Sequence, residues 1–124
     1  MSTKAKLLIV DDEDTLRMLV RTELEENGYA VDDAEDGEKA LEKIQADSYD
    51  LVILDIAMPG LNGLKVLQKI RETNNAVKVI MLTGVDELKI ARDSLQLGAS
   101  DFLTKPYDIK TLLACINRVL NENK

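Results

Sequence analysis

Polar side chains that could do chemistry directly follow four apolar runs of the chain. In chain order they are Asp11 and Asp12, Asp55, Thr83, and Lys105. Three carboxylates held together repel one another, and one would take up a proton unless a cation joined them. Mg²⁺ fits such a group because it needs only one or two carboxylates and also accepts a phosphate oxygen. Carboxylates, Mg²⁺, a lysine and a hydroxyl predict a site for phosphoryl transfer, with Asp55 as the nucleophile.

Each of these residues also has an ordinary structural explanation when it is taken alone. Asp residues after a strand are common in turns, and Thr is at home in strands. A single Lys is usually a solvated surface charge. The set becomes specific only if the fold brings these strand ends to one place.

The elements that must position these residues alternate between short apolar runs and segments with helical spacing. The runs of strand length are residues 7–10, 29–31, 51–54, 77–82 and 101–104. Residues 51–54 are all large and apolar, which is typical of a parallel strand buried on both faces. The alternation predicts an α/β fold with helices on both faces of a parallel sheet. In such a sheet the carboxyl ends of the strands share one edge, where ligands bind.

The segments between the strands carry apolar residues at helical spacing. The expected buried positions are Leu16, Leu19, Val20 and Leu24; Ala40, Leu41 and Ile44; Leu64, Leu67 and Ile70; Leu88, Ala91 and Leu95; and Leu112, Ile116, Val119 and Leu120. Asp14 is the predicted N-cap of the first helix, and Asn27-Gly28 its stop. Gly98 is predicted to end the fourth helix.

Composition narrows the class of protein. The chain has 124 residues, enough for a single domain with its own core. It contains no His, which removes Ser-His and Cys-His nucleophile pairs and imidazole zinc sites, and its one cysteine, Cys115, is expected in the core. The net charge of -7 disfavours nucleic acid as a partner and favours a basic protein or a cation. No apolar run approaches membrane-spanning length, so we expect a soluble, cytoplasmic protein.

The sequence resembles the receiver domains of two-component response regulators. The resemblance is carried by Ile9-Val10-Asp11-Asp12-Glu13, Leu54-Asp55, Met58-Pro59-Gly60, Asn62-Gly63, Met81-Leu82-Thr83-Gly84, Gly98-Ala99 and Lys105-Pro106. It implies a flavodoxin-like, doubly wound (βα)5 sheet of strand order 2-1-3-4-5. It also implies that residues 1–124 form one stand-alone receiver domain without an output domain.

The same resemblance implies a role for each site residue. Asp55 would be the phosphoacceptor, supplied by a histidine kinase or a histidine phosphotransfer protein. Mg²⁺ would be held by Asp11, Asp12, Asp55 and the backbone carbonyl of Ala57. Thr83 would be the switch hydroxyl and Lys105 the cation that pairs with the phosphoryl group.

Further expectations from the resemblance concern the switch and its surroundings. The Lys105-Pro106 peptide bond is expected to be cis. Phe102 occupies the position of a switch aromatic, although plain core packing would also explain it. Ala57 and Val85 are expected not to orient a hydrolytic water, so that Val85→Glu should change the dephosphorylation rate several-fold.

The output of such a domain is a surface that changes with phosphorylation. We expect a downstream target protein to bind the fourth helix, fifth strand and fifth helix. Ile90, Leu97, Tyr107 and Leu113 are candidate exposed apolar residues there, or else they complete the core. Met18 on the first helix would be an anchor for the phosphodonor if exposed, and gap filling if buried. The expected state is a monomer.

Three other readings compete with a signalling phosphoacceptor. A phosphatase with an Asp nucleophile usually needs a second acid two residues later, where this chain has Ala57. A flavodoxin-like cofactor binder would need a phosphate-binding first loop and aromatic walls, but the loop is acidic and aromatic residues are only 3%. A degenerate receiver acting as an adaptor is disfavoured because all five signature positions are filled.

Overall fold

The computed structural model describes residues 5–58, 60–73 and 76–122, in which strands and helices alternate. The elements are β1 (Lys6–Val10), α1 (Asp14–Glu26), β2 (Ala30–Ala34), α2 (Gly37–Ala46), β3 (Leu51–Asp55), α3 (Gly63–Glu72), β4 (Lys78–Thr83), the 3₁₀ turn η1 (Val85–Glu87), α4 (Leu88–Gln96), β5 (Asp101–Thr104) and α5 (Ile109–Leu120).

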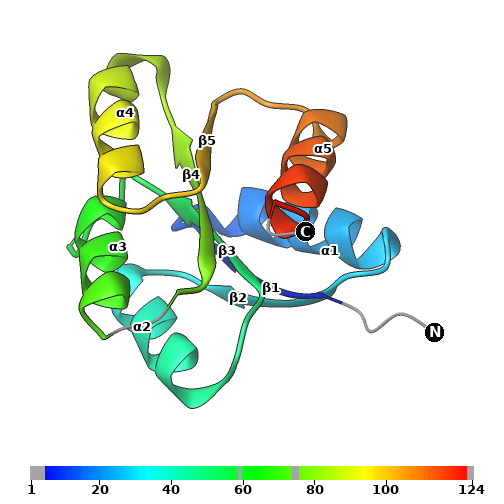
Figure 1. Cartoon of the computed structure of the whole chain (residues 1–124). Coiled ribbons are helices and arrows are strands. Elements are labelled where there is room, and N and C mark those ends of the chain that lie inside the picture. The colour runs from blue at the N-terminus through cyan, green and yellow to red at the C-terminus, as the bar shows by residue number, and fades with distance from the viewer. Residues whose placement is uncertain (1–4, 59, 74–75, 123–124) are drawn as a thin grey trace.

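The strands form one parallel sheet in the order β2-β1-β3-β4-β5, as predicted (Figure 1). The register places Val10 beside Leu54, and Asp55 beside Leu82. Strands β1, β3 and β4 therefore end at neighbouring points, because parallel strands run in one direction. This edge of the sheet carries the residues that follow each strand.

Helices cover both faces of the sheet, with α1 and α5 on one side and α2, α3 and α4 on the other (Figure 1). Strand β3 is buried at every position. Ile53 packs in the core under α1 and α5, whereas its neighbour Leu54 packs in the core under the other three helices. The unbroken apolar run of β3 follows from this double burial, because successive side chains point to opposite faces.

The first helix differs from the prediction in two places. Asp14 is its first residue and not its N-cap; Glu13 holds that position in an extended conformation and makes no capping bond with its side chain. Leu19 is 54% exposed, while Arg17 is 8% exposed. A guanidinium group occupies the buried side here because acidic and carbonyl partners are available to it. The predicted stop is confirmed, with Asn27 as C-cap and Gly28 at φ 95°.

Strand β2 is longer than the predicted residues 29–31. It pairs with β1 along its whole length, up to Val10 beside Ala34. Its two acidic residues are half-buried, and each has a partner: Asp32 accepts from the hydroxyl of Tyr49 at 2.7 Å, and Asp33 accepts from Arg17 at 2.7 Å. The strand thus continues through Asp32 and Asp33 because side chains from neighbouring elements bind their carboxylates.

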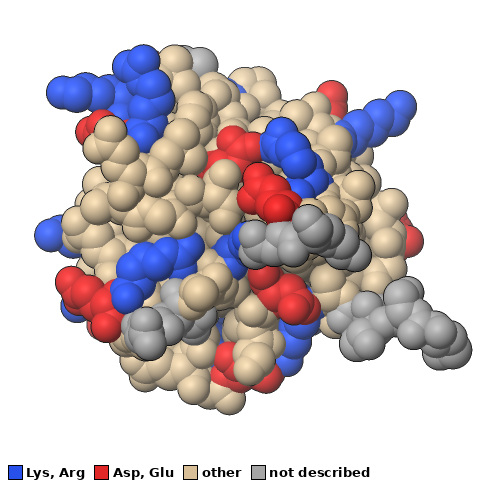
Figure 2. Space-filling view, viewed as in Figure 1, with Lys and Arg blue, Asp and Glu red and all other residues tan. Residues whose placement is uncertain are grey.

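Other local expectations can be compared with the structure directly. Cys115 is buried, as predicted. Leu88 and Leu95 on α4 are each 41% exposed, contrary to expectation, whereas Ala91 is buried as predicted and Ser94 is buried as well. Basic and acidic side chains are interspersed on the face shown in Figure 2. Among the described residues, no helix is long and apolar enough to cross a bilayer.

Candidate functional site

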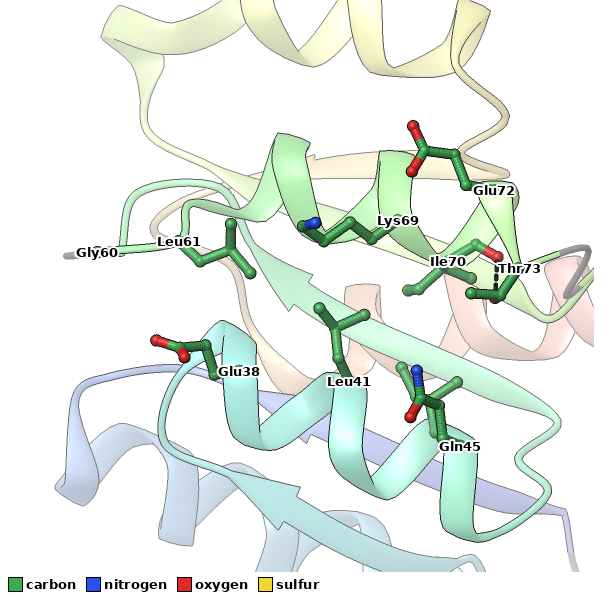
Figure 3. A pocket seen from close by; sticks show the side chains of 10 residues that line it. Glu38, Leu41, Gln45, Gly60, Leu61, Lys69, Ile70, Glu72 and Thr73 are labelled. Carbon is green, nitrogen blue, oxygen red and sulfur yellow. Dashed lines mark hydrogen bonds between the residues drawn. The ribbon is translucent and has the colours of Figure 1, made fainter.

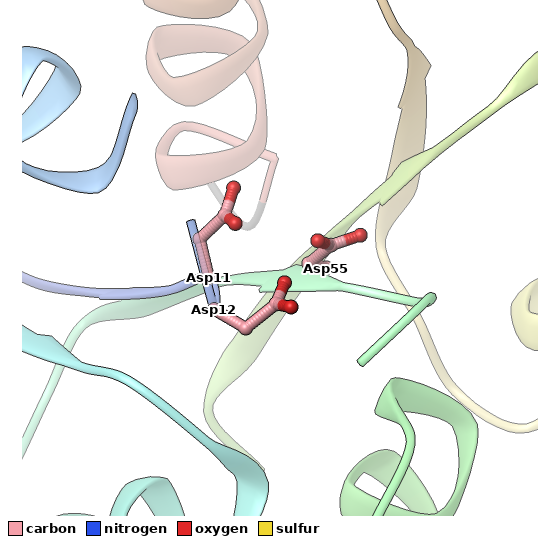
Figure 4. A group of neighbouring side chains, drawn as sticks. All are labelled: Asp11, Asp12 and Asp55. Atoms are coloured by element: carbon pink, nitrogen blue, oxygen red, sulfur yellow. The ribbon is translucent and has the colours of Figure 1, made fainter. Parts of the chain in front are cut away.

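Three carboxylates meet at the carboxyl ends of β1 and β3. Asp11 and Asp12 directly follow β1, and Asp55 is the last residue of β3 (Figure 4). Each offers an oxygen within 4.8 Å of the others. Asp11 and Asp55 are buried and Asp12 is exposed, so the cluster opens to solvent on one side only.

The two buried carboxylates are held by backbone amides. Asp11 Oδ1 accepts a hydrogen bond from the amide of Glu13 at 2.9 Å, and Asp55 Oδ1 accepts one from the amide of Ala57 at 3.2 Å. Asp11 Oδ2, by contrast, is buried without a hydrogen-bond partner in the part of the chain that the structure describes. A buried carboxylate oxygen that accepts no hydrogen bond is costly, and a bound cation would satisfy it.

Lys105 supplies the positive charge of the site. Its ammonium nitrogen lies 3.1 Å from Asp55 Oδ2 and 3.7 Å from Asp11 Oδ2. Its backbone amide donates to the carbonyl of Thr83 at 2.7 Å, which ties the end of β5 to the end of β4. The Lys105-Pro106 bond is cis, as expected.

The charges of this group perturb one another. Burial raises the pKa of Asp55 to about 6; Lys105 opposes this shift and Asp11 adds to it. Burial lowers the pKa of Lys105, but the carboxylates of Asp55 and Asp11 outweigh burial and raise it overall. One lysine therefore does not neutralise the site, and a divalent cation with oxygen ligands fits the three carboxylates, including the oxygen of Asp11 that accepts no hydrogen bond.

Thr83 and Phe102 are not among the residues that line the cleft over the carboxylates. Thr83 is fully buried, and its hydroxyl donates to the carbonyl of Gly84 at 3.1 Å. Phe102 is half-buried against the core under α2, α3 and α4. Their roles in switching stay predictions. The side chain of Val85 lies outside the described part, so its predicted effect on dephosphorylation is untested as well.

The cleft over the carboxylates also contains residues that the sequence did not single out. It has a volume of about 510 Å³ and is lined by Asp11, Asp12, Glu13, Asp55, Ala57, Gly84, Glu87 and Lys105. Glu87 accepts a hydrogen bond from the amide of Gly84 at 2.9 Å. The sequence does contain a signal for this contact. A Glu at the third position of a helical turn commonly accepts a hydrogen bond from the backbone amide of the residue that precedes the turn.

A larger hollow of about 670 Å³ lies between α2 and α3, away from the carboxylates. Leu41, Leu61 and Ile70 line it, with Glu38 and Lys69 at its sides (Figure 3). At one end of the hollow the hydroxyl of Thr73 donates a hydrogen bond to the carbonyl of Ile70 at 2.8 Å (Figure 3). Glu38, Lys69 and Glu72 line the hollow, but among the described residues the close group of three carboxylates lies in the acidic cleft, which makes the smaller cleft the candidate site.

Comparison with known proteins agrees with this geometry. The family model described as the response regulator receiver domain matches residues 7–117. The uncharacterized transcriptional regulatory protein YkoG of Bacillus subtilis is 39% identical over 97% of this chain and 53% of its own length. The chemotaxis protein CheY of Bacillus subtilis is 37% identical over 94% of this chain and 98% of its own. The chain spans about half the length of YkoG and several other relatives.

Solved structures give the same result. The receiver domain of the Francisella response regulator 1452 has a TM-score of 0.90 at 33% identity, covering 98% of this chain and 100% of that one. The chemotaxis protein CheY4 of Vibrio cholerae has a TM-score of 0.88 at 33% identity, covering 94% of this chain and 99% of that one.

Proposed function

We propose that Asp55 accepts a phosphoryl group from a phosphohistidine. The premise is that this chain belongs to the family of response regulator receiver domains. Receiver domains interact with histidine kinases and with downstream targets. For this chain the proposed donor is a histidine kinase or a histidine phosphotransfer protein. The proposal keeps the cytoplasmic location and monomeric state predicted from the sequence.

One observation carries the proposal: a buried Asp carboxylate lies beside an ammonium group and two further acids in an open cleft. Lys105 is 3.1 Å from Asp55, and Asp11 and Asp12 have oxygens within 4.8 Å of it. The three acids would hold Mg²⁺, with the carbonyl of Ala57 as a proposed further ligand. When bound, the ion would supply charge neutralisation for the carboxylates and the incoming phosphoryl oxygens.

The residues of the chain divide the chemistry between them. An oxygen of Asp55 forms a bond to phosphorus while the bond from phosphorus to the imidazole nitrogen breaks, and that nitrogen keeps the electron pair. Lys105 faces the charge that the phosphoryl group brings. The residues of the site would promote the transfer by placing the reacting groups and by compensating the negative charge of the phosphoryl group. The chain is thus a phosphoacceptor that loses its phosphoryl group slowly, and not an enzyme that turns over substrates.

The proposed output surface consists of α4, β5 and α5. Of the four apolar residues suggested for it, only Ile90 is exposed, at 40%. Leu97, Tyr107 and Leu113 are half-buried and pack against the core. Leu88 and Leu95 are exposed on α4 and replace these three residues as proposed contacts for the target. Thr83 and Phe102 would transmit the phosphorylated state to this surface.

The proposed docking surface for the donor is α1. Met18 is 48% exposed on it and Leu19 is 54% exposed. The exposure of Met18 supports the binding-anchor alternative over gap filling in the core.

The experiment is phosphorylation with a small phosphodonor, acetyl phosphate, in the presence of Mg²⁺. Intact mass should show one added phosphoryl group on the wild type and none on Asp55→Asn. Asp93→Asn, on the exposed side of α4, is the matched control and should be modified normally. A phosphoryl group on Asp55→Asn, or none on the wild type, would contradict the proposal. Sustained hydrolysis of many phosphate esters would favour a phosphatase instead.

A further inference from the structure

Arg17 is the buried cation closest in the chain to the acid pair, and it makes three contacts. Its Nη1 donates to the backbone carbonyl of Asp11 at 2.8 Å. Its Nε donates to Asp33 at 2.7 Å, and its Nη2 lies 2.8 Å from Asp14. The guanidinium group thus joins the loop after β1, the edge strand β2 and the first turn of α1.

The contact with Asp11 falls on the peptide bond that links the two acids of the site. The carbonyl of this peptide belongs to Asp11, and its nitrogen belongs to Asp12. The amide of Asp11 is also held, since it donates to the carbonyl of Ala34 at 3.2 Å. The peptide groups on both sides of the Asp11 Cα are therefore held, one by Ala34 at the end of β2 and one by Arg17 of α1, and the directions of both carboxylates depend on them.

We propose that Arg17 is a positioning residue for the cation site: by holding the peptide bond between Asp11 and Asp12, it keeps both carboxylates aimed at one ion. Asp33 and Asp14 hold the guanidinium group in turn. The inference rests on the proposed function only in the identity of the ion. Outer partners of metal ligands commonly change metal affinity by about 10–100-fold when they are removed.

The charge of Arg17 and its hydrogen bond to Asp11 predict opposite effects of a substitution on Mg²⁺ binding, which makes the inference testable. Arg17 is a cation near a site for a cation. Removing its charge would, by electrostatics alone, strengthen the binding of Mg²⁺. Removing its hydrogen bond to Asp11 should weaken binding, because the peptide bond is then free to turn.

Arg21 is the matched control, four residues further along α1. It shares Asp33, with Nη1 2.5 Å from the other carboxylate oxygen, and its second contact is Glu25 at 3.4 Å. No hydrogen bond from Arg21 to the loop after β1 occurs in the described structure. Arg21→Gln therefore removes the same charge and an ion pair with the same acid, but leaves the Asp11 carbonyl bonded.

The first measurement is calorimetric titration with MgCl₂ of the wild type, Arg17→Gln and Arg21→Gln. Arg17→Gln should bind Mg²⁺ at least about 10-fold more weakly than the wild type. Arg21→Gln should bind within about twofold of the wild type, or more tightly, since the hydrogen bond to the Asp11 carbonyl stays in place. Affinity in Arg17→Gln equal to or above that in Arg21→Gln would overturn the inference.

The second measurement separates positioning from a general loss of structure. The rate of phosphorylation by acetyl phosphate is followed against Mg²⁺ concentration. Arg17→Gln should need more Mg²⁺ for half its maximal rate, but should approach the wild-type rate at saturation; a low rate at saturating Mg²⁺ would overturn a positioning role. Should Arg17→Gln fail to fold, Arg17→Lys replaces it; its single ammonium nitrogen keeps the charge but cannot make all three contacts, so the loss of affinity should be smaller and in the same direction.

The same experiments distinguish this inference from the proposed function. Mg²⁺ binding by the wild type without phosphorylation would refute the phosphoacceptor proposal and leave the role of Arg17 standing. Normal phosphorylation of the wild type together with unchanged Mg²⁺ affinity in Arg17→Gln would refute the role of Arg17 alone. Absence of Mg²⁺ binding by the wild type would refute both.

Discussion

Asp55 is buried beside a second carboxylate and a single lysine, and its ionisation is less favourable there than in water. Its pKa is raised from 3.8 to about 6. A carboxyl group with a raised pKa contributes stability that is fully present at low pH, below the pKa of the unfolded chain. That contribution is lost as the pH rises through about 6, where the buried group must become charged.

The first prediction follows from this loss of stability with rising pH. In EDTA, Asp55→Asn should gain stability over the wild type as the pH rises from about 4 to about 7, by roughly 1–3 kcal/mol. The pKa of about 6 already includes the opposing effect of the ion pair with Lys105. Urea unfolding of both proteins at each pH measures the difference. A difference that does not change with pH would contradict the prediction, and saturating Mg²⁺ should reverse it by stabilising only the wild type.

A second residue-scale prediction concerns Tyr107. Its hydroxyl is buried and has no hydrogen-bond partner among the described residues. Burial, together with the charges of Asp11 and Asp55, raises its pKa to about 12. Because an unpartnered buried hydroxyl is unfavourable, Tyr107→Phe should stabilise the fold by about 1 kcal/mol.

Tyr49 is the matched control for Tyr107, because its hydroxyl donates to Asp32 at 2.7 Å. Tyr49→Phe should destabilise the fold by about 1 kcal/mol, since it removes a hydrogen bond and leaves the carboxylate behind. Urea denaturation of the two variants measures both effects. The prediction is wrong if Tyr107→Phe is the more destabilising of the pair.

At the scale of elements, the site depends on how closely α3 approaches the end of β3. Gly63 begins α3, and its amide donates to the carbonyl of Ile56 at 3.0 Å. A Cβ at Gly63 would lie 2.3 Å from the backbone oxygen of Asp55 and 2.8 Å from the Cα of Ile56. Both atoms are backbone, so neither can move without displacing Asp55.

The third prediction is that Gly63→Ala destabilises the protein by about 3 kcal/mol or more and lowers Mg²⁺ affinity with it. The control is Gly28→Ala, where φ is 95° but no atom lies within 4 Å of the added carbon. That variant should cost only about 1–2 kcal/mol, for the backbone conformation alone, and leave Mg²⁺ binding unchanged. Equal losses of stability in the two variants would show that the close approach is unimportant.

At the scale of the whole molecule, the sheet separates two cores, one under α1 and α5 and one under α2, α3 and α4. Ile53 and Leu54 are adjacent in β3, are both fully buried, and point into different cores. The fourth prediction is that Ile53→Ala and Leu54→Ala each cost about 2–5 kcal/mol in urea unfolding. A loss below about 1 kcal/mol for either would mean that one face of β3 is not packed.

The fold could be predicted because its signals are local and repeated. The apolar run of residues 51–54 indicated a central parallel strand, and the structure buries every residue of β3. Two of the exceptions, the length of β2 and the burial of Arg17, are places where a polar side chain has its partner on a distant element. Arg17 is one such case, because nothing in its neighbourhood along α1 shows that Asp33 and the Asp11 carbonyl will surround it.

The candidate site divides in the same way. The residue types that follow the strands, and their order along the chain, already indicated carboxylates, a hydroxyl and a lysine at one edge, since parallel strands must end together. Distances, burial and the perturbed pKa of Asp55 depend on packing between elements far apart in the chain. So does the burial of the Asp11 oxygen that accepts no hydrogen bond. Hydrophobic periodicity encodes which face of an element is buried, but only the packed fold decides which charges meet there, because electrostatic interactions depend on separation and solvent exposure in three dimensions.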